Sequence, residues 1–498
     1  MKFDPLWKQV PQGMLNFFLR QRIVRSALLK KAQDRLYENF VMKNEDDRPP
    51  LVQKARCVML GNLLHTVNAA LSDGRISPGV FGAITKNFIG GILLGQEDRS
   101  ANFFREHGVW PPAFLTISPT KRCNLFCTGC YASSSSGSAE TLKYDVLNRI
   151  IKEKKELWGS RFNVISGGEP LLYNDGGKTL FDLIEENNDC YFMMYTNSTL
   201  IDKAAARRMA GLGNLTPAIS VEGFEKETDN RRGKGVFKKI MNAMDNLREA
   251  GVPFGVSVTA TRHNVDTIMS DEFTDFYFRQ RGAVYGWVFQ YMPIGRSYTV
   301  DLMITPEQRL ALFRNEQRMI KDFKVFMVDF WNGGPYSLGC ISAGRPGGYF
   351  YIDWNGNIAP CAFMPYYLSN IYDLYKEGRT LNDVLFSDYF TSIRKWQNDY
   401  GYAQPAGKMK NFIVPCIIRD HFPSALDIVK KFNVKPMDAN AHQALEDTDY
   451  HGRMTEYGKK VKEITEPLWL EEFMGTNDKT QIDKTADDNC KMKGLYGG

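Results

Sequence analysis

Three of the chain's nine cysteines lie close together, in the segment KRCNLFCTGCYA at positions 121–132. Their spacing is Cys123-x3-Cys127-x2-Cys130, and the segment contains no fourth cysteine and no histidine. Thiolates are soft ligands that favour zinc or iron–sulfur clusters over hard cations. Three protein ligands with one open position admit a substrate or a cofactor. The spacing therefore predicts a reactive metal or iron–sulfur site, with buried structural thiols as the alternative.

The composition is that of an ordinary folded protein in a reducing compartment. The chain has 498 residues, 43% hydrophobic and 24% charged, which suffices for a catalytic domain with smaller additions. The start, MKFDPLWKQV, lacks the layout of a secretory signal, and no uninterrupted apolar run is long enough to span a bilayer. We therefore expect a cytoplasmic protein, in which clustered cysteines bind metals more often than they form disulfides. The net charge of +6 does not indicate a nucleic-acid partner.

The cysteine segment must be positioned by an alternation of strands and helices that begins near residue 113. Six β-rich runs, each followed by a helical pattern, imply a parallel sheet with right-handed crossovers. The fold class expected is α/β, with a partial (β/α)6 TIM-like barrel at its centre. The β-rich runs occupy residues 113–118, 162–166, 191–196, 217–221, 254–260 and 285–292.

Polar or glycine-rich segments follow each of the first three predicted strands. The cysteine loop follows the first strand, GGEP (167–170) the second and NST (197–199) the third. In α/β barrels, ligands bind at the carboxyl ends of the parallel strands. The three segments are therefore predicted to meet at one rim.

The N-terminal region reads as helical. In residues 12–43, apolar residues recur at helical spacing among many arginines and lysines. Two interpretations remain open for this segment: a helix that packs on the protein, or a basic amphipathic helix that makes a peripheral contact with an anionic membrane. A second helical block is predicted to end near residue 105.

A β-hairpin is predicted beyond the barrel, at residues 347–361. Asn355 and Gly356 would form its turn, as a type I′ turn in which both residues have positive φ. Cys340 and Cys361 flank the hairpin, and Cys416 follows in PCIIRDHF.

The chain resembles the radical SAM enzymes over roughly residues 110–300. The resemblance rests on the cysteine spacing, on the glycine-rich SGGEPLL element and on the order of the βα units. It implies that Cys123, Cys127 and Cys130 hold three irons of a [4Fe-4S] cluster, whose fourth iron chelates S-adenosylmethionine (SAM). In this family, reductive cleavage of SAM yields a 5′-deoxyadenosyl radical, which abstracts hydrogen from a substrate.

The resemblance also implies which residues contact SAM. The turn at residues 290–296 would border the adenine, and Ser220 would face the ribose and the carboxylate. The full set of implied SAM contacts is Gly167, Gly168, Glu169, Asn197, Ser220, Arg232 and Ser257.

The C-terminal cysteines resemble those of a SPASM or twitch extension, which implies an auxiliary iron–sulfur cluster held by Cys340, Cys361 and Cys416. Its fourth ligand would be Asp420, His421 or Cys490, or the site would be open. A zinc site and inert thiols are the alternatives.

The expected regions are a helical extension (1–110), the barrel (111–325), a hairpin-containing auxiliary cluster region (326–440), and a C-terminal helix with a mobile tail (441–498).

The function expected from the resemblance is a radical SAM enzyme, either an oxidoreductase or another radical-mediated modifying enzyme. Its substrate would be a peptide, a lipid or a small molecule, and its electron would come from an external reductant such as flavodoxin or ferredoxin. A non-enzymatic iron–sulfur carrier and a zinc-stabilised interaction protein are the competing hypotheses.

Overall fold

The computed structural model describes residues 21–84 and 97–475. The start of the predicted helix, the apolar segment FIGGILLG and the C-terminal tail with Cys490 fall largely or wholly outside these residues. Within the described part, α2 (Arg22–Tyr37) continues into a π-helical turn, η2 (Glu38–Lys43).

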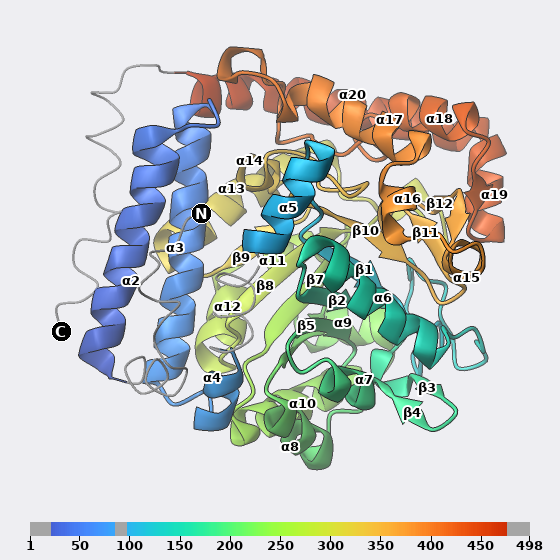
Figure 1. Ribbon diagram of the computed structural model, residues 1–498. Coiled ribbons are helices and arrows are strands. Elements are labelled where there is room, and N and C mark those ends of the chain that lie inside the picture. Colours follow the sequence, from blue (N-terminus) through green and yellow to red (C-terminus); the bar gives the residue numbers. More distant parts are fainter. Residues whose placement is uncertain (1–20, 85–96, 476–498) are drawn as a thin grey trace.

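The core of the molecule is a ten-stranded sheet in the order β13-β11-β10-β1-β2-β5-β6-β7-β8-β9 (Figure 1). The six predicted strands form its centre, pair in parallel and lie in chain order, so the partial α/β barrel is confirmed. These strands are β1 (Phe114–Ile117), β2 (Phe162–Ile165), β5 (Tyr191–Thr196), β6 (Leu215–Val221), β7 (Gly255–Ala260) and β8 (Tyr285–Gln290).

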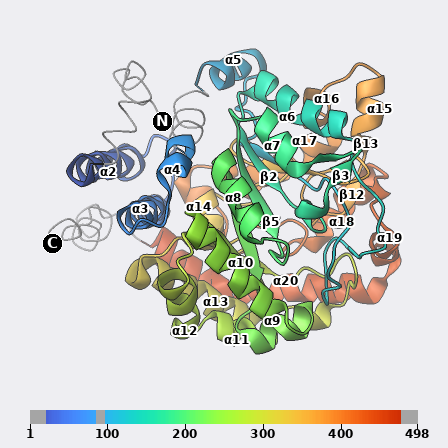
Figure 2. The same cartoon turned by 90° about the horizontal axis from the view of Figure 1, so that it is seen from below.

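Amphipathic helices connect these strands along the outside of the barrel (Figure 2). In α6, Leu147, Ile150 and Ile151 are fully buried at helical spacing, and Gly159 ends the helix with φ of 71°. The connecting helices are α6 (Tyr144–Trp158), α7 (Leu180–Glu186), α8 (Lys203–Leu212), α9 (Glu225–Arg232), α10 (Val236–Ala250), α11 (Val265–Ile268) and α12 (Asp271–Thr274), and α13 (Pro306–Arg318) follows β8.

Two further strands extend the barrel sheet at its two edges. β9 (Met327–Asp329) pairs in parallel with β8, and β10 (Tyr349–Ile352) pairs in parallel with β1. The connection between them, which contains α14 (Gly334–Ser337) and Cys340, therefore runs from one edge of the barrel to the other. The C-terminal cysteines are thus built onto the barrel itself.

The predicted hairpin is present, but its turn is not of type I′. β10 and β11 (Asn357–Ala359) are antiparallel, and the turn is closed by hydrogen bonds from Asp353 N to Asn357 O (3.1 Å) and from Gly356 N to Asp353 O (3.0 Å). Only Gly356 has a positive φ, of 80°, whereas type I′ requires it at Asn355 as well. The Asp353 carboxylate accepts a hydrogen bond from Asn355 N at 2.9 Å, which supports this three-residue loop.

The N-terminal helices pack against one another on one flank of the barrel (Figures 1 and 2). Leu36 and Tyr37 of α2 lie in one buried cluster with Val58 of α3 (Pro50–Ser72) and with Tyr336 of α14. This packing favours the protein-packing interpretation for the described part of α2. Within residues 21–84 and 97–475, no helix combines the length and the apolar character that crossing a membrane requires.

The remaining elements belong to the N-terminal region, to the segment between β2 and α7, and to the part of the chain after β11. The helices are α4 (Pro78–Ile84), α5 (Glu97–His107), α15 (Ile371–Lys376), α16 (Leu381–Leu385), α17 (Asp388–Gln397), α18 (Phe422–Lys431), α19 (Ala439–Glu446) and α20 (Thr448–Trp469). The short strands are β3 (Asn174–Asp175), β4 (Lys178–Thr179), β12 (Tyr366–Tyr367), β13 (Ser369–Asn370) and β14 (Lys435–Pro436).

Candidate functional site

One cavity of about 280 Å³ lies inside the barrel and reaches the carboxyl ends of its strands. The thiols of the cysteine loop line it together with most of the residues predicted to contact SAM. Ser220 of β6 and Ser257 of β7 are direct neighbours across the sheet and both reach this cavity. The predicted residues that line the cavity are Cys123, Cys127, Cys130, Gly167, Gly168, Asn197, Ser220, Arg232 and Ser257.

The glycines after β2 allow the cysteine loop to approach at main-chain distance. Gly168 N donates a hydrogen bond to Thr120 O at 2.8 Å. A Cβ on Gly167 would lie 2.6 Å from Thr120 O, and a Cβ on Gly168 would collide with the main-chain oxygen of Arg122. Gly167 also has a φ of 123°, which side chains rarely permit. These glycines therefore fix the position of the cysteine loop as well as line the cavity.

Polar donors approach two of the three sulfurs of the loop. Asn197 Nδ2 lies 3.7 Å from Cys123 Sγ, and Arg232 Nη1 lies 4.0 Å from Cys127 Sγ. Burial raises the pKa of the Cys123 thiol to about 12, against the opposing effect of a hydrogen bond from Leu125 N. A metal binds the deprotonated thiolate, and hydrogen-bond donors close to the sulfur favour this thiolate over the thiol.

Glu169 lies behind the cavity, where it joins two loops. Its carboxylate accepts hydrogen bonds from Leu171 N at 3.2 Å, Thr196 Oγ1 at 2.8 Å and Asn197 N at 2.8 Å. It is fully buried, and this burial raises its pKa to about 7. The structure therefore places Glu169 as a support for Asn197, which in turn faces Cys123.

Glu222 is a buried residue of this site that sequence reasoning missed. Both Arg231 and Arg232, which line the cavity, form ion pairs with its carboxylate, and Arg232 Nε lies 2.8 Å from Glu222 Oε1. Thr259 N donates to Glu222 Oε2 at 3.2 Å. Glu222 directly follows β6, two residues after Ser220. Residues two apart along a strand face the same side, and this spacing was the available signal.

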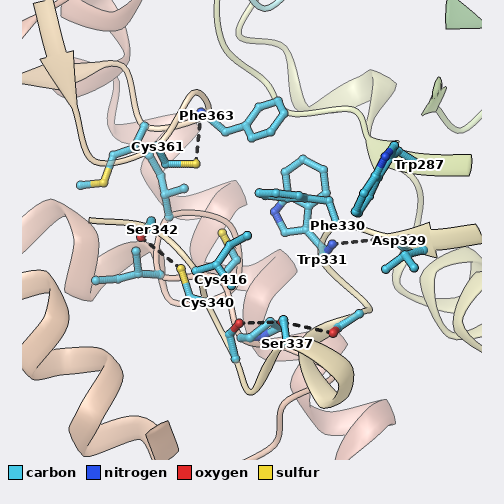
Figure 3. Close-up of a pocket in the computed structure, with 18 residues that line it drawn as sticks. Trp287, Asp329, Phe330, Trp331, Ser337, Cys340, Ser342, Cys361, Phe363 and Cys416 are labelled. Carbon is cyan, nitrogen blue, oxygen red and sulfur yellow. Dashed lines mark hydrogen bonds between the residues drawn. The ribbon is translucent and has the colours of Figure 1, made fainter. Parts of the chain in front are cut away.

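Cys340, Cys361 and Cys416 line a second cavity of about 80 Å³ (Figure 3). Their sulfurs lie opposite the rings of Phe330, Trp331 and Phe363 in this view. The Tyr349 hydroxyl lies 3.0 Å from Cys361 Sγ, and the Ser342 hydroxyl lies 3.2 Å from Cys340 Sγ. Burial raises the pKa of the Cys361 thiol to about 12 and that of Cys416 well above its usual range. The structure thus brings together three thiols from three separate segments.

Neither residue proposed from the sequence as a fourth ligand, within the described part of the chain, lines this cavity. Asp420 forms a buried ion pair with Arg309. His421 Nε2 lies 2.9 Å from Val414 O, and its ring packs against Trp396 and Tyr400. The carboxylate that does line the cavity belongs to Asp329.

The two cavities share a wall. Trp287, Phe330, Ile341 and Phe363 line both of them. The Nε1 atom of Trp287 is buried without a hydrogen-bond partner. The cysteine-lined cavity of the C-terminal region and the barrel cavity therefore meet at these four residues.

Comparison with known proteins identifies the barrel. Residues 117–272 match the family model of the Radical SAM superfamily. This part of the chain is a radical SAM domain. This superfamily uses a [4Fe-4S] cluster and SAM, so the cofactor prediction from the resemblance is confirmed at the level of the superfamily.

Relatives of this chain include several enzymes. AdoMet-dependent heme synthase of Methanosarcina barkeri is 26% identical over 289 residues, covering 52% of this chain and 79% of that protein. Mycofactocin maturase MftC of Mycolicibacterium smegmatis is 29% identical over 311 residues, covering 59% of this chain and 75% of that protein. These relatives do not favour the non-enzymatic carrier hypothesis.

A solved structure supports the fold. Native anSMEcpe with bound AdoMet and the Kp18Cys peptide has a TM-score of 0.50 and 18% sequence identity to this chain. The match covers 74% of this chain and 100% of that one. The likeness concerns the fold alone.

The donor sets of both cavities suit iron–sulfur clusters. Each cavity presents three cysteines, and these six are free of disulfides. Thiolates are the usual ligands of such clusters. Among residues 21–84 and 97–475, no three His, Cys, Asp or Glu side chains are arranged to hold a single metal ion.

Replacement of Glu222 tests the charge balance beside the cysteine loop. Glu222→Gln leaves two largely buried guanidinium groups without their carboxylate, so we expect it to reduce the free energy of unfolding by about 3 kcal/mol. Glu185→Gln, in an exposed pair with Arg208, serves as the control and should cost less than about 1 kcal/mol. Urea denaturation measures both; equal small losses would contradict the assignment.

The raised pKa of Glu169 predicts a pH-dependent contribution to stability. Between pH 4.5 and about 7 the folded chain retains a proton that the unfolded chain has lost, so this contribution decreases as the pH rises. Relative to Glu169→Gln, the wild type should lose about 3 kcal/mol between pH 4.5 and 8. Thermal unfolding of both proteins across this range measures the difference, and a constant difference would refute the prediction.

Proposed function

We propose that Cys123, Cys127 and Cys130 hold a [4Fe-4S] cluster and that the barrel cavity binds SAM beside it. When bound, these groups supply a 5′-deoxyadenosyl radical that abstracts a hydrogen atom from a substrate. The observation that carries the proposal is the shared cavity: these three thiols and all but one of the predicted SAM contacts line it.

Different residues of the cavity would contact different parts of SAM. Gly167 and Gly168 line the cavity, where the ligand would contact their main chain. Ser220 and Ser257 present adjacent hydroxyl groups for polar atoms of the ligand. Arg232 provides a cation near Cys127, and Glu222 holds it in place.

We further propose that Cys340, Cys361 and Cys416 hold an auxiliary iron–sulfur cluster. An external reductant such as flavodoxin or ferredoxin would supply the electron for SAM cleavage. The shared wall at Trp287 and Phe330 supports a role for this second cluster in the same reaction.

The lining of the barrel cavity supports a neutral, apolar substrate group, and we propose that this group belongs to a peptide. The charged side chains of its lining, Arg231 and Arg232, are both paired with Glu222, and the rest of the lining carries no charged side chain. Peptides are favoured because one relative is a maturase and anSMEcpe carries a bound peptide. The apolar lining includes Phe114, Phe162, Met193, Trp287, Phe289, Phe330 and Phe363.

The cluster assignment predicts the effect of replacing one thiol. Cys127→Ala should lower the rate of 5′-deoxyadenosine formation, with dithionite and SAM present, at least 100-fold, because the cluster loses a ligand. Cys190→Ala removes a buried cysteine outside both cavities and should retain the rate within about twofold. Chromatography of the quenched reaction measures the nucleoside. Full activity of Cys127→Ala would refute the proposal.

The substrate proposal predicts which small probes bind to the holoenzyme. N-acetyl-phenylalaninamide should bind at least tenfold more tightly than GTP, because the cavity offers rings but no unpaired cation. Met193→Lys places a charge in the lining and should weaken the amide at least tenfold, whereas Met42→Lys, at a residue that is 64% exposed, should not. Saturation-transfer NMR measures both probes. Tighter binding of GTP would contradict the proposal.

A further inference from the structure

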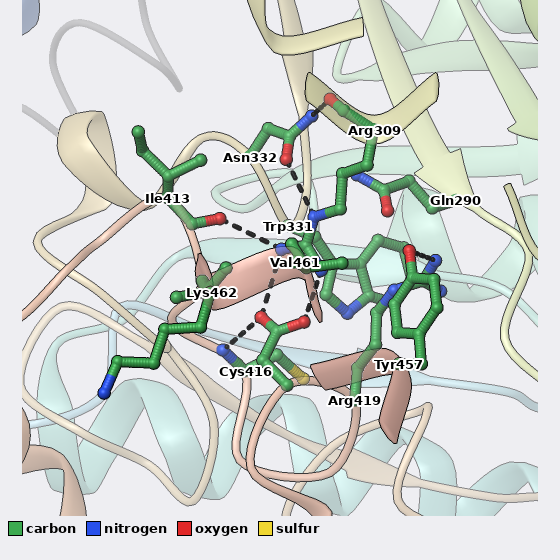
Figure 4. Close-up of polar contacts among 12 residues, drawn as sticks. Gln290, Arg309, Trp331, Asn332, Ile413, Cys416, Arg419, Tyr457, Val461 and Lys462 are labelled. Carbon is green, nitrogen blue, oxygen red and sulfur yellow. Dashed lines mark hydrogen bonds and ion pairs between the residues drawn. The ribbon is translucent and has the colours of Figure 1, made fainter. Parts of the chain in front are cut away.

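Arg309 and Asp420 form a buried ion pair between α13 and the segment that follows Cys416 (Figure 4). Both side chains are 0% exposed. Arg309 Nη1 contacts Asp420 Oδ1, and Arg309 Nη2 lies 3.1 Å from Asp420 Oδ2. One guanidinium group therefore contacts both carboxylate oxygens, in the bidentate geometry typical of strong arginine–carboxylate pairs.

The same carboxylate holds the main chain at Cys416. Cys416 N donates to Asp420 Oδ2 at 3.0 Å, while Asp420 N donates back to Cys416 O at 2.9 Å. His421 N also donates to Cys416 O, at 3.2 Å. These bonds close residues 416–421 into a compact turn, and the thiol of Cys416 projects from this turn into the second cavity.

Arg309 is itself fixed by further buried partners. Its Nε donates to Asn332 Oδ1 at 3.0 Å, and its Nη2 donates to Ile413 O at 3.0 Å. Asn332 N donates to Asp329 Oδ1 at 2.9 Å, and Asp329 also accepts a bond from Gln290 Nε2. A continuous buried network thus connects the turn at Cys416 with Gln290, which lines the barrel cavity.

We propose that Arg309 and Asp420 are positioning residues for the auxiliary cluster, and that Asp420 is not its fourth ligand. The inference rests on the proposed function, because it requires Cys416 to ligate a cluster. Withdrawing Asp420 toward iron would leave the buried Arg309 charge unpaired, which is strongly unfavourable. Asp420 is also outside the set of residues that line the cysteine cavity.

The test uses the full chain with Cys123, Cys127 and Cys130 all changed to Ala, so that iron reports only the auxiliary cluster. In this parent, Asp420→Asn and Arg309→Gln should each accelerate iron release to bathophenanthroline disulfonate at least tenfold and alter the EPR spectrum of the reduced cluster. The double variant should release iron no faster than either single variant, because the two residues act as one unit. Asp301→Asn, in an exposed pair with Arg453, is the matched control and should leave both readouts unchanged.

Asp420→Cys separates positioning from ligation. The thiolate of this variant could replace a lost ligand, but it cannot pair with Arg309 through two oxygens. If Asp420 is a positioning residue, Asp420→Cys should therefore release iron as fast as Asp420→Asn. A wild-type release rate in Asp420→Cys, together with fast release in Asp420→Asn, would identify Asp420 as a ligand and overturn the proposal. Unchanged iron release and EPR in Asp420→Asn would also overturn it.

Two further measurements distinguish loss of the positioning role from absence of the auxiliary cluster and from misfolding of the barrel. A parent that binds no iron would refute the auxiliary cluster, and the positioning role would fall with it. Folding is checked in the Asp420→Asn chain that retains Cys123, Cys127 and Cys130. It should still form 5′-deoxyadenosine from SAM, since the first cluster lies in a separate cavity. Complete loss of the nucleoside there would show general disruption of the barrel and overturn a role confined to Cys416.

Discussion

The main-chain contact between the cysteine loop and the turn after β2 is the constraint on which this site depends. Gly168 N and Glu169 N donate to carbonyl oxygens of Thr120 and Arg122, so the loop is fixed to the barrel by its backbone. The absence of side chains at Gly167 and Gly168 makes this approach possible. The strand ends of the barrel then add the remaining groups around the thiols, because parallel strands bring their carboxyl ends to one rim.

Buried charges near both cysteine sets are held in ion pairs. Glu222 pairs with two arginines beside the first set, and Asp420 pairs with Arg309 beside the second. Burying an unpaired ion is costly, whereas a hydrogen-bonded pair is tolerated. Both arginines of the barrel lining therefore have a carboxylate partner, and the rest of this lining carries no charged side chain.

The connection from β9 to β10 joins the two cysteine sets into one architecture. Because these strands flank the sheet at opposite edges, the segment between them carries Cys340 across the open side of the barrel. The aromatic and aliphatic side chains of this crossing, together with Trp287 of β8, line both cavities. A group bound in the barrel cavity would thus be close to residues that also line the cavity of the second set of thiols.

The sequence by itself determined the six βα units, the order of the site segments and the identity of the thiols. These features depend on short-range patterns: the alternation of apolar residues, the spacing of cysteines within one loop and the glycines of one turn. It placed the hairpin but not its turn type, because the Asp353 side chain stabilises a different loop.

Only the tertiary structure decided which distant residues meet. Arg309 and Asp420 are 111 positions apart, and Glu222 accepts a hydrogen bond from Thr259 N, 37 positions further along the chain. Glu169 likewise lies outside the cavity lining because the loops after β2 and β5 meet, and its carboxylate there accepts a hydrogen bond from Asn197 N. Such pairings follow from how helices and strands pack together, and this packing has no counterpart in the spacing of residues along the chain.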